Sequence, residues 1–237
     1  MANISTSTLC RLSGLALLVA LPVQVAGLAM HPPGERVVDL LTTLQGPAHM
    51  VLFVSWFLVL LGLPGLYARQ AERAGLLGLI GFVASMFAIA YTLYLVLYEA
   101  FPAVLLAQNP ATQDAVATGG PLAHGVVLGD FGFVTVLGFP VFGLAMLRAA
   151  VLPRVVGWLQ IAYVPGLLAS IIALSLTLGD EVLANLPGAG QPIAIMSYLL
   201  FISYARGGYF LWRPREAEAI GATSEAPLYS GASAGMA

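Results

Sequence analysis

Long apolar runs separated by short polar connections constrain this chain more than any other feature. About six of the runs reach the roughly 20 residues that a helix needs to cross a hydrocarbon core at 1.5 Å per residue. They cover residues 12–30, 48–67, 76–98, 124–147, 155–178 and 192–212. The runs therefore predict an all-α fold, a polytopic transmembrane helix bundle with about six spans.

The composition excludes a soluble globular domain. The chain is 59% hydrophobic and 8% charged, whereas soluble domains carry about 25% charged residues. Its length suits one membrane domain over residues 1–215, followed by a polar, glycine-rich tail at 216–237 that is too poor in apolar residues to fold. The absence of lysine excludes a retinal Schiff base, and the single cysteine, Cys10, excludes a cysteine-rich metal site.

The basic residues and the histidines fall on opposite sides of these spans. When the spans are threaded in order, His31, His49 and His124 lie on one side together with a single arginine, Arg36. The arginines on the other side are Arg11, Arg69, Arg73, Arg148, Arg154, Arg213 and Arg215. Because cytoplasmic loops carry the excess of arginine and lysine, both termini are expected in the cytoplasm.

The first run has a second interpretation. Gly27-Leu28-Ala29 ends in small residues suited to a cleavage site, so residues 1–29 could be a signal peptide. The run is longer than a usual signal core and contains Pro22 and Gln24, which favours a retained helix. The orientation of the later spans is the same in both cases.

Two connections on the histidine side are more apolar than ordinary loops. Residues 35–45 have the spacing of a short helix lying in the interface, and residues 101–107 are apolar too. We expect either a cap over this end of the bundle or two ordinary interfacial loops. A weak internal repeat joins Gly46-Pro47-Ala48-His49 to Gly120-Pro121-Leu122-Ala123-His124, which suggests duplicated hairpins, with chance similarity among common membrane residues as the alternative.

His49 and His124 are candidate ligands, because each follows a proline at the start of a predicted span. The positive end of the helix dipole disfavours imidazolium there, and neutral imidazole is the form that binds a metal ion or haem iron. The two histidines therefore suggest a b-type haem or a metal ion. The alternative is that they are interfacial helix-end residues, since two histidines without a ligand spacing are a weak signal.

Three acidic and aromatic features complete the candidate ligand or ion site. Asp130 lies about 9 Å deeper than His124 along its helix, which suggests an ion path or a hydrogen bond between helices. Glu99 follows the third span. Tyr91 and Tyr94 precede it on one helix face, where they could line a ligand pocket or belong to an aromatic belt at the interface.

No catalytic motif, phosphate-binding loop or basic stripe for nucleic acid is present, so an enzymatic role stays open and nucleic acid is not an expected partner.

The chain resembles uncharacterised bacterial multi-span membrane proteins. The resemblance rests on the stretches from His49 to Gln70 and from Gly75 to Phe82, together with Met30-His31-Pro32 and Tyr98-Glu99-Ala100-Phe101. That resemblance implies a six-span bundle in a bacterial cytoplasmic membrane, and it transfers no site residues.

Three functional classes remain open from the sequence. The first is a small-molecule or ion binding and transport module with an outward-facing polar site formed by His49, Glu99, His124 and Asp130. The second is a membrane redox subunit in which His49 and His124 ligate haem or a metal ion. The third is an accessory subunit of a membrane complex. The expected partners are the lipid bilayer and either a second copy of the chain or a larger membrane complex.

Overall fold

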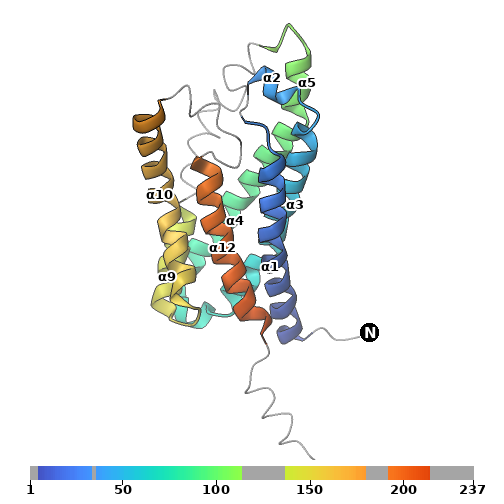
Figure 1. Cartoon of the computed structure of the whole chain (residues 1–237). Coiled ribbons are helices and arrows are strands. Elements are labelled where there is room, and N and C mark those ends of the chain that lie inside the picture. Colours follow the sequence, from blue (N-terminus) through green and yellow to red (C-terminus); the bar gives the residue numbers. More distant parts are fainter. Residues whose placement is uncertain (1–4, 34–35, 114–136, 180–191, 214–237) are drawn as a thin grey trace, which may run out of the picture.

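The computed structural model describes residues 5–33, 36–113, 137–179 and 192–213, and these segments are all-helical (Figure 1). Within them, four stretches are long and apolar enough to cross a membrane, namely Ser7–Met30, Gln45–Ala68, Ala71–Gln108 and Arg154–Leu178. The predicted all-α fold with long apolar helices is confirmed for these residues, and the four stretches are compatible with an integral membrane protein. His124, Asp130 and the predicted tail at 216–237 lie outside the described residues.

The predicted spans correspond closely to the observed helices, which mostly extend beyond them. They are α1 Thr6–Met30, α3 Gln45–Ala68, α4 Ala71–Ala100, α9 Gly138–Ala149, α10 Arg154–Leu178 and α12 Pro192–Trp212. Of the predicted span 124–147, only the part from residue 137 is described, and there α9 has 12 residues. The helix α12 carries Arg206 and three tyrosines, and it is not among the four spanning candidates.

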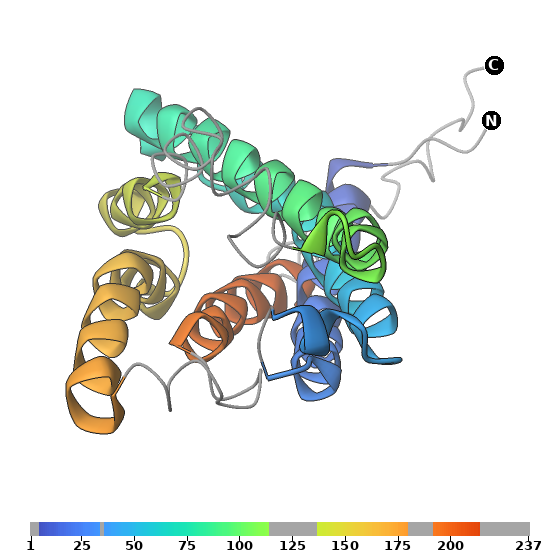
Figure 2. The same ribbon diagram turned by 90° about the horizontal axis from the view of Figure 1, so that it is seen from above.

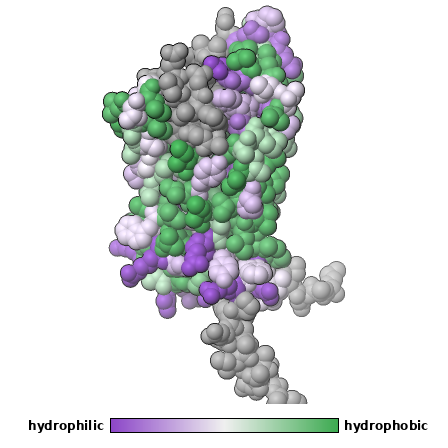
Figure 3. All heavy atoms as spheres, viewed as in Figure 1, coloured by the Kyte–Doolittle hydropathy of each residue, from purple (hydrophilic) through white to green (hydrophobic). Residues whose placement is uncertain are grey.

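The long helices form a closed ring when viewed from above (Figure 2). Each one contacts two main neighbours, in the order α1, α3, α4, α9, α10, α12 and back to α1. A single apolar core fills the ring, and all six helices contribute to it, for example through Leu17, Val59, Ile89, Phe142, Val164 and Phe201. Hydrophilic residues gather at the two ends of the molecule and hydrophobic ones in the band between them (Figure 3).

Glycines allow neighbouring helices to approach until their backbones nearly touch. A Cβ added to Gly14 of α1 would lie 2.6 Å from the carbonyl oxygen of Gly208 in α12, and the reverse substitution gives the same distance. The pair Gly143 and Gly157 joins α9 to α10 in the same reciprocal way, at 2.6 and 2.7 Å. Small residues at such crossings permit the van der Waals packing that drives helix association in lipid.

Two short elements lie at one end of the ring, on the side of α3 and α4 (Figure 2). They are α2 (Val37–Leu40) and α5 (Pro102–Gln108), and they pack against each other through Leu40, Ala103 and Ala107 (Figure 1). The described parts of the two apolar connections therefore pack together, as the cap alternative expects. At the opposite end, Gly75 adopts a left-handed φ of 57° and separates the single turn Ala71–Ala74 from the rest of α4.

The α9–α10 crossing gives a direct test of the glycine packing. Gly143→Ala should lower the free energy of unfolding by about 1–3 kcal/mol, because the new methyl group overlaps a backbone carbonyl that cannot move alone. The measurement is thermal or denaturant unfolding of the purified protein. The matched control is Gly46→Ala, whose Cβ would meet its nearest atom at 3.6 Å and which should be neutral or slightly stabilising. Equal stability of the two variants would contradict this account.

Candidate functional site

A cluster of polar side chains lies beneath the α2–α5 cap, and His49 of α3 and Glu99 of α4 are its centre. Nε2 of His49 lies 3.0 Å from Oε2 of Glu99. The His49 side chain is 1% exposed and that of Glu99 is 23% exposed. The sequence singled out both residues, and the structure brings them together from two helices.

Local sequence explains how each side chain reaches this position. The helix α3 begins at Gln45, three residues before the predicted start, so His49 lies in its second turn rather than its first. The earlier start costs little, because Pro47 then lies among the first four residues, whose N–H groups have no partner within the helix. The helix α4 extends to Ala100, so Glu99 lies in its last turn and not in a following loop.

The second ring nitrogen of His49 identifies its tautomer. Nδ1 lies 2.8 Å from the carbonyl oxygen of Gln45, one turn earlier in the same helix. A carbonyl oxygen only accepts hydrogen bonds, so Nδ1 carries a hydrogen and donates it. The contact between Nε2 and Glu99 therefore requires a second proton, held either by the imidazole or by the carboxyl group.

Gln45 ties the two helices together at the same level. Its side-chain Nε2 donates to the backbone carbonyl of Glu99 at 3.4 Å, and the residue is fully buried. Its Oε1 has no hydrogen-bond partner within the described segments, and neither does the hydroxyl of Tyr98. Both are buried polar atoms without a described partner, and such atoms are costly in an apolar interior unless they are satisfied.

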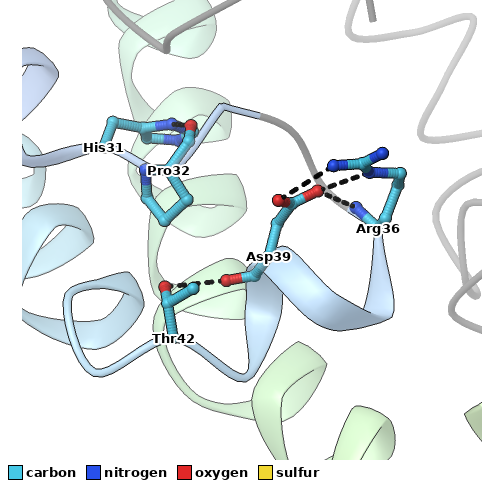
Figure 4. Close-up of polar contacts among 5 residues, drawn as sticks. All are labelled: His31, Pro32, Arg36, Asp39 and Thr42. Atoms are coloured by element: carbon cyan, nitrogen blue, oxygen red, sulfur yellow. Dashed lines mark hydrogen bonds and ion pairs between the residues drawn. The ribbon is translucent and has the colours of Figure 1, made fainter. Parts of the chain in front are cut away.

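His31 completes the cluster from the end of α1. Its ring centroid lies 4.7 Å from that of His49 with the planes tilted by 50°. Its Nδ1 lies 2.7 Å from the carbonyl oxygen of Pro32 and donates to it (Figure 4). Burial lowers the pKa of His31 below its ordinary value of 6.5, the Pro32 hydrogen bond opposes that shift, and His49 adds to it. His31 is therefore held as a neutral imidazole beside the pair.

An ion pair orders the short helix above this cluster. The Arg36 guanidinium donates to the carboxylate of Asp39 at 2.8 Å, and the Thr42 hydroxyl donates to the Asp39 carbonyl at 2.8 Å (Figure 4). The hydrogen bond from Arg36 lowers the pKa of Asp39 below its ordinary value, although burial acts against it. Arg36, the arginine on the histidine side, thus neutralises the buried acid of α2.

The other sequence candidates are only partly drawn into this cluster. Tyr91 and Tyr94 contact each other with ring centroids 6.4 Å apart, and Tyr94 is 46% exposed on the outer side of α4. The described contacts include no hydrogen bond from either tyrosine to His49 or Glu99. Whether His124 and Asp130 join the cluster falls outside the described residues.

Metal or haem ligation by His49 would require a rearrangement. Both of its ring nitrogens are engaged, one by Gln45 and the other by Glu99, and a ligand nitrogen needs a free lone pair. Within the described residues, no group of three or more histidine, cysteine, aspartate or glutamate side chains lies close enough to hold a metal ion.

Sequence reasoning missed two members of the cluster, Gln45 and His31. Gln45 precedes His49 by four residues, which is the spacing of neighbours on one helix face, but the predicted helix began after it. His31 lies at the same end of the bundle as His49 in the predicted topology, and this was the available signal.

Comparison of the chain with family models, with curated proteins and with solved structures found no match.

The lowered pKa of His31 predicts a pH dependence of stability. Below about pH 6.5 the unfolded chain binds a proton at His31 more readily than the folded one, so stability should fall as the pH decreases from there through the folded-state pKa. His31→Gln should remove this component of the pH dependence.

The measurement is the melting temperature of wild type and His31→Gln between about pH 5 and 8. The difference between the two proteins should grow in favour of the variant as the pH falls. Parallel curves would mean that His31 is not held neutral by the fold.

Proposed function

We propose that this chain is an integral membrane protein of about six spans that binds and transfers a proton at one end of its bundle, as the ion site of a transport module. The observation that carries the proposal is the His49–Glu99 pair. Its imidazole is 1% exposed and lies 3.0 Å from a carboxylate on another helix. Ionisable side chains within membrane segments are costly and by default suggest a proton or ion path.

The number of protons that His49 and Glu99 hold between them suits the binding of a single transferable proton. Because Nδ1 of His49 donates to Gln45, the contact with Glu99 holds one proton on either the ring or the carboxyl group. Both forms have a net charge of zero and are tolerated in an apolar environment. One more proton gives a net positive charge, and loss of one gives a net negative charge.

The exposure of the two side chains gives the transfer a direction. Glu99 is 23% exposed, whereas His49 is 1% exposed, so we take Glu99 as the entry point of the proton. A proton taken up at the Glu99 carboxyl group is passed to Nε2 of His49 across the same hydrogen bond. The ring of His31 packs against His49 with centroids 4.7 Å apart, and burial disfavours its protonation, so the shared proton stays between His49 and Glu99.

Buried polar side chains continue from this site into the core. Gln24 of α1 accepts a hydrogen bond from Ser55 of α3 and donates to Ser197 of α12 at 3.4 Å. Towards the other end, the Tyr204 hydroxyl and the Gln160 amide are buried without a partner in the described segments. Such groups are expensive inside an apolar bundle, and their presence at several depths favours a polar path over a purely structural role.

The orientation of the site follows from the arginines. Arg11, Arg69, Arg73, Arg148, Arg154 and Arg213 lie at helix ends opposite to His49. If that end faces the cytoplasm, as the distribution of basic residues favours, both termini are cytoplasmic and the proton site opens outwards. The bacterial cytoplasmic membrane is the proposed location.

The test measures proton binding and proton flux in the same set of proteins. In histidine-labelled protein, the Nε2 resonance of His49 should respond to pH between about 4 and 9 while Nδ1 keeps its hydrogen. In vesicles with a trapped pH indicator, wild type should equilibrate an imposed pH gradient faster than Glu99→Gln, because the amide cannot exchange the shared proton.

Glu72→Gln is the matched control, since it removes an exposed carboxylate from the opposite end of the same helix. It should behave as wild type in both measurements. The proposal would be wrong if the His49 resonance stayed constant over the whole pH range, or if wild type and Glu99→Gln gave equal proton flux. The His49–Glu99 contact would then have only the structural role of holding α3 against α4. That result would favour the accessory-subunit alternative.

A further inference from the structure

A continuous series of backbone hydrogen bonds leads from α2 to the first residue of α3. At every third residue, an N–H group donates to the carbonyl oxygen three residues earlier. The distances are 2.9 Å from Asp39 to Arg36, 3.2 Å from Thr42 to Asp39 and 3.3 Å from Gln45 to Thr42. We call these four residues the 36–45 series. It links the residue that precedes α2 to the start of the helix that carries His49.

The last residue of the 36–45 series contacts both members of the proton pair. The carbonyl oxygen of Gln45 accepts the hydrogen bond from Nδ1 of His49 at 2.8 Å. The side-chain Nε2 of Gln45 donates to the backbone carbonyl of Glu99 at 3.4 Å. Because Gln45 is fully buried between the two helices, a displacement of this residue changes both contacts at once.

The first part of the 36–45 series is fixed by Asp39. Its carboxylate accepts from Nε of Arg36 at 2.8 Å, from Nη2 at 3.3 Å and from the backbone N–H of Arg36 at 3.3 Å. Its carbonyl oxygen accepts from the Thr42 hydroxyl at 2.8 Å (Figure 4). The Asp39 side chain is 8% exposed, so its charge needs the guanidinium beside it. A helix of only four residues is not stable by itself, so these contacts determine the shape of α2.

Apolar packing joins α2 to the segment that follows Glu99. Leu40 is buried against Ala103 and Ala107 of α5. The helix α5 begins at Pro102, three residues after Glu99. The 36–45 series therefore reaches the His49 side of the pair through α3 and lies against the Glu99 side through α5.

We propose that Arg36 and Asp39 are positioning residues for the proton pair, and that the 36–45 series holds His49 at the distance from Glu99 that proton transfer needs. This role rests on the proposed function of the pair. Arg36 and Asp39 carry opposite charges and have no net charge together, so they act through position and not through a net field. Without the Asp39 carboxylate, α2 loses the contacts that shape it, and Gln45 loses the fixed end of its support. The hydrogen bonds of His49 then open more often, and transfer slows because it depends steeply on the geometry of donor and acceptor.

The test compares wild type with Asp39→Asn in the full chain, by NMR of histidine-labelled protein and by proton flux in vesicles. Asp39→Asn should speed the exchange of the His49 Nδ1 hydrogen with water about tenfold, because loss of a capping carboxylate shifts a local opening equilibrium by that order. Proton flux should fall by about tenfold, since a small displacement of the pair is enough for such a loss. Arg36→Lys keeps the charge but loses the two-point contact, so its exchange rate and flux should lie between those of the two proteins.

Val38→Ala is the matched control, since Val38 belongs to the same short helix and is 64% exposed. It should match wild type in exchange rate and flux. Thermal unfolding checks the folding of each variant. If Asp39→Asn does not fold, Thr42→Val replaces it, because that change removes the hydroxyl bond to Asp39 and keeps the shape of the side chain.

The outcomes separate this role from the function on which it rests. If wild type conducts protons and its His49 resonance responds to pH, while Asp39→Asn has the exchange rate and flux of wild type, the positioning role alone is overturned. A lower melting temperature of Asp39→Asn with unchanged exchange and flux would leave the ion pair a structural role only, and would overturn it as well. A wild-type His49 resonance that does not respond to pH would overturn the proposed function, and the positioning role with it.

Discussion

The close approach of α1 and α12 at Gly14 and Gly208 is the contact on which the rest of the structure depends. It closes the ring, because the first and last described helices meet there with no side chain between their backbones. Closure makes α1 a neighbour of both α3 and α12, so that Gln24 bonds to Ser55 and Ser197 at once. Lipid tails are as apolar as the helix surfaces, so the hydrophobic effect does not drive helices together within a membrane. Close packing and interhelical hydrogen bonds supply the free energy of association instead.

The closed ring has two chemically different ends. Beneath the α2–α5 cap, the ionisable groups are paired so that net charge is avoided, as in His49 with Glu99 and Arg36 with Asp39. At the opposite end, Arg69, Glu72 and Arg73 line a polar hollow. The two ends therefore differ in their charged groups, with histidine and acids gathered near one end and mostly arginines at the other.

The sequence predicted the individual helices well because apolar length is a local property. The bounds of α10 and α12 differ from the predicted spans by one residue or less. Errors occur where local signals compete. Pro47 suggested a helix start at residue 48, yet the preceding turn already leads into α3 at Gln45. Glu99 was expected beyond α4, yet α4 continues to Ala100 because nothing between Tyr98 and Ala100 breaks a helix.

The amino-acid sequence by itself determined the all-helical apolar character of this protein, the separation of arginine from histidine, and His49 and Glu99 as candidates. Hydropathy and charge act residue by residue, so they can be read without knowing neighbours in space. Only the tertiary structure decided that Glu99 is the partner of His49 and that Gln45 and His31 join them. These relations depend on which helices the ring makes adjacent, because each of them joins side chains whose distance is set by packing and not by chain separation.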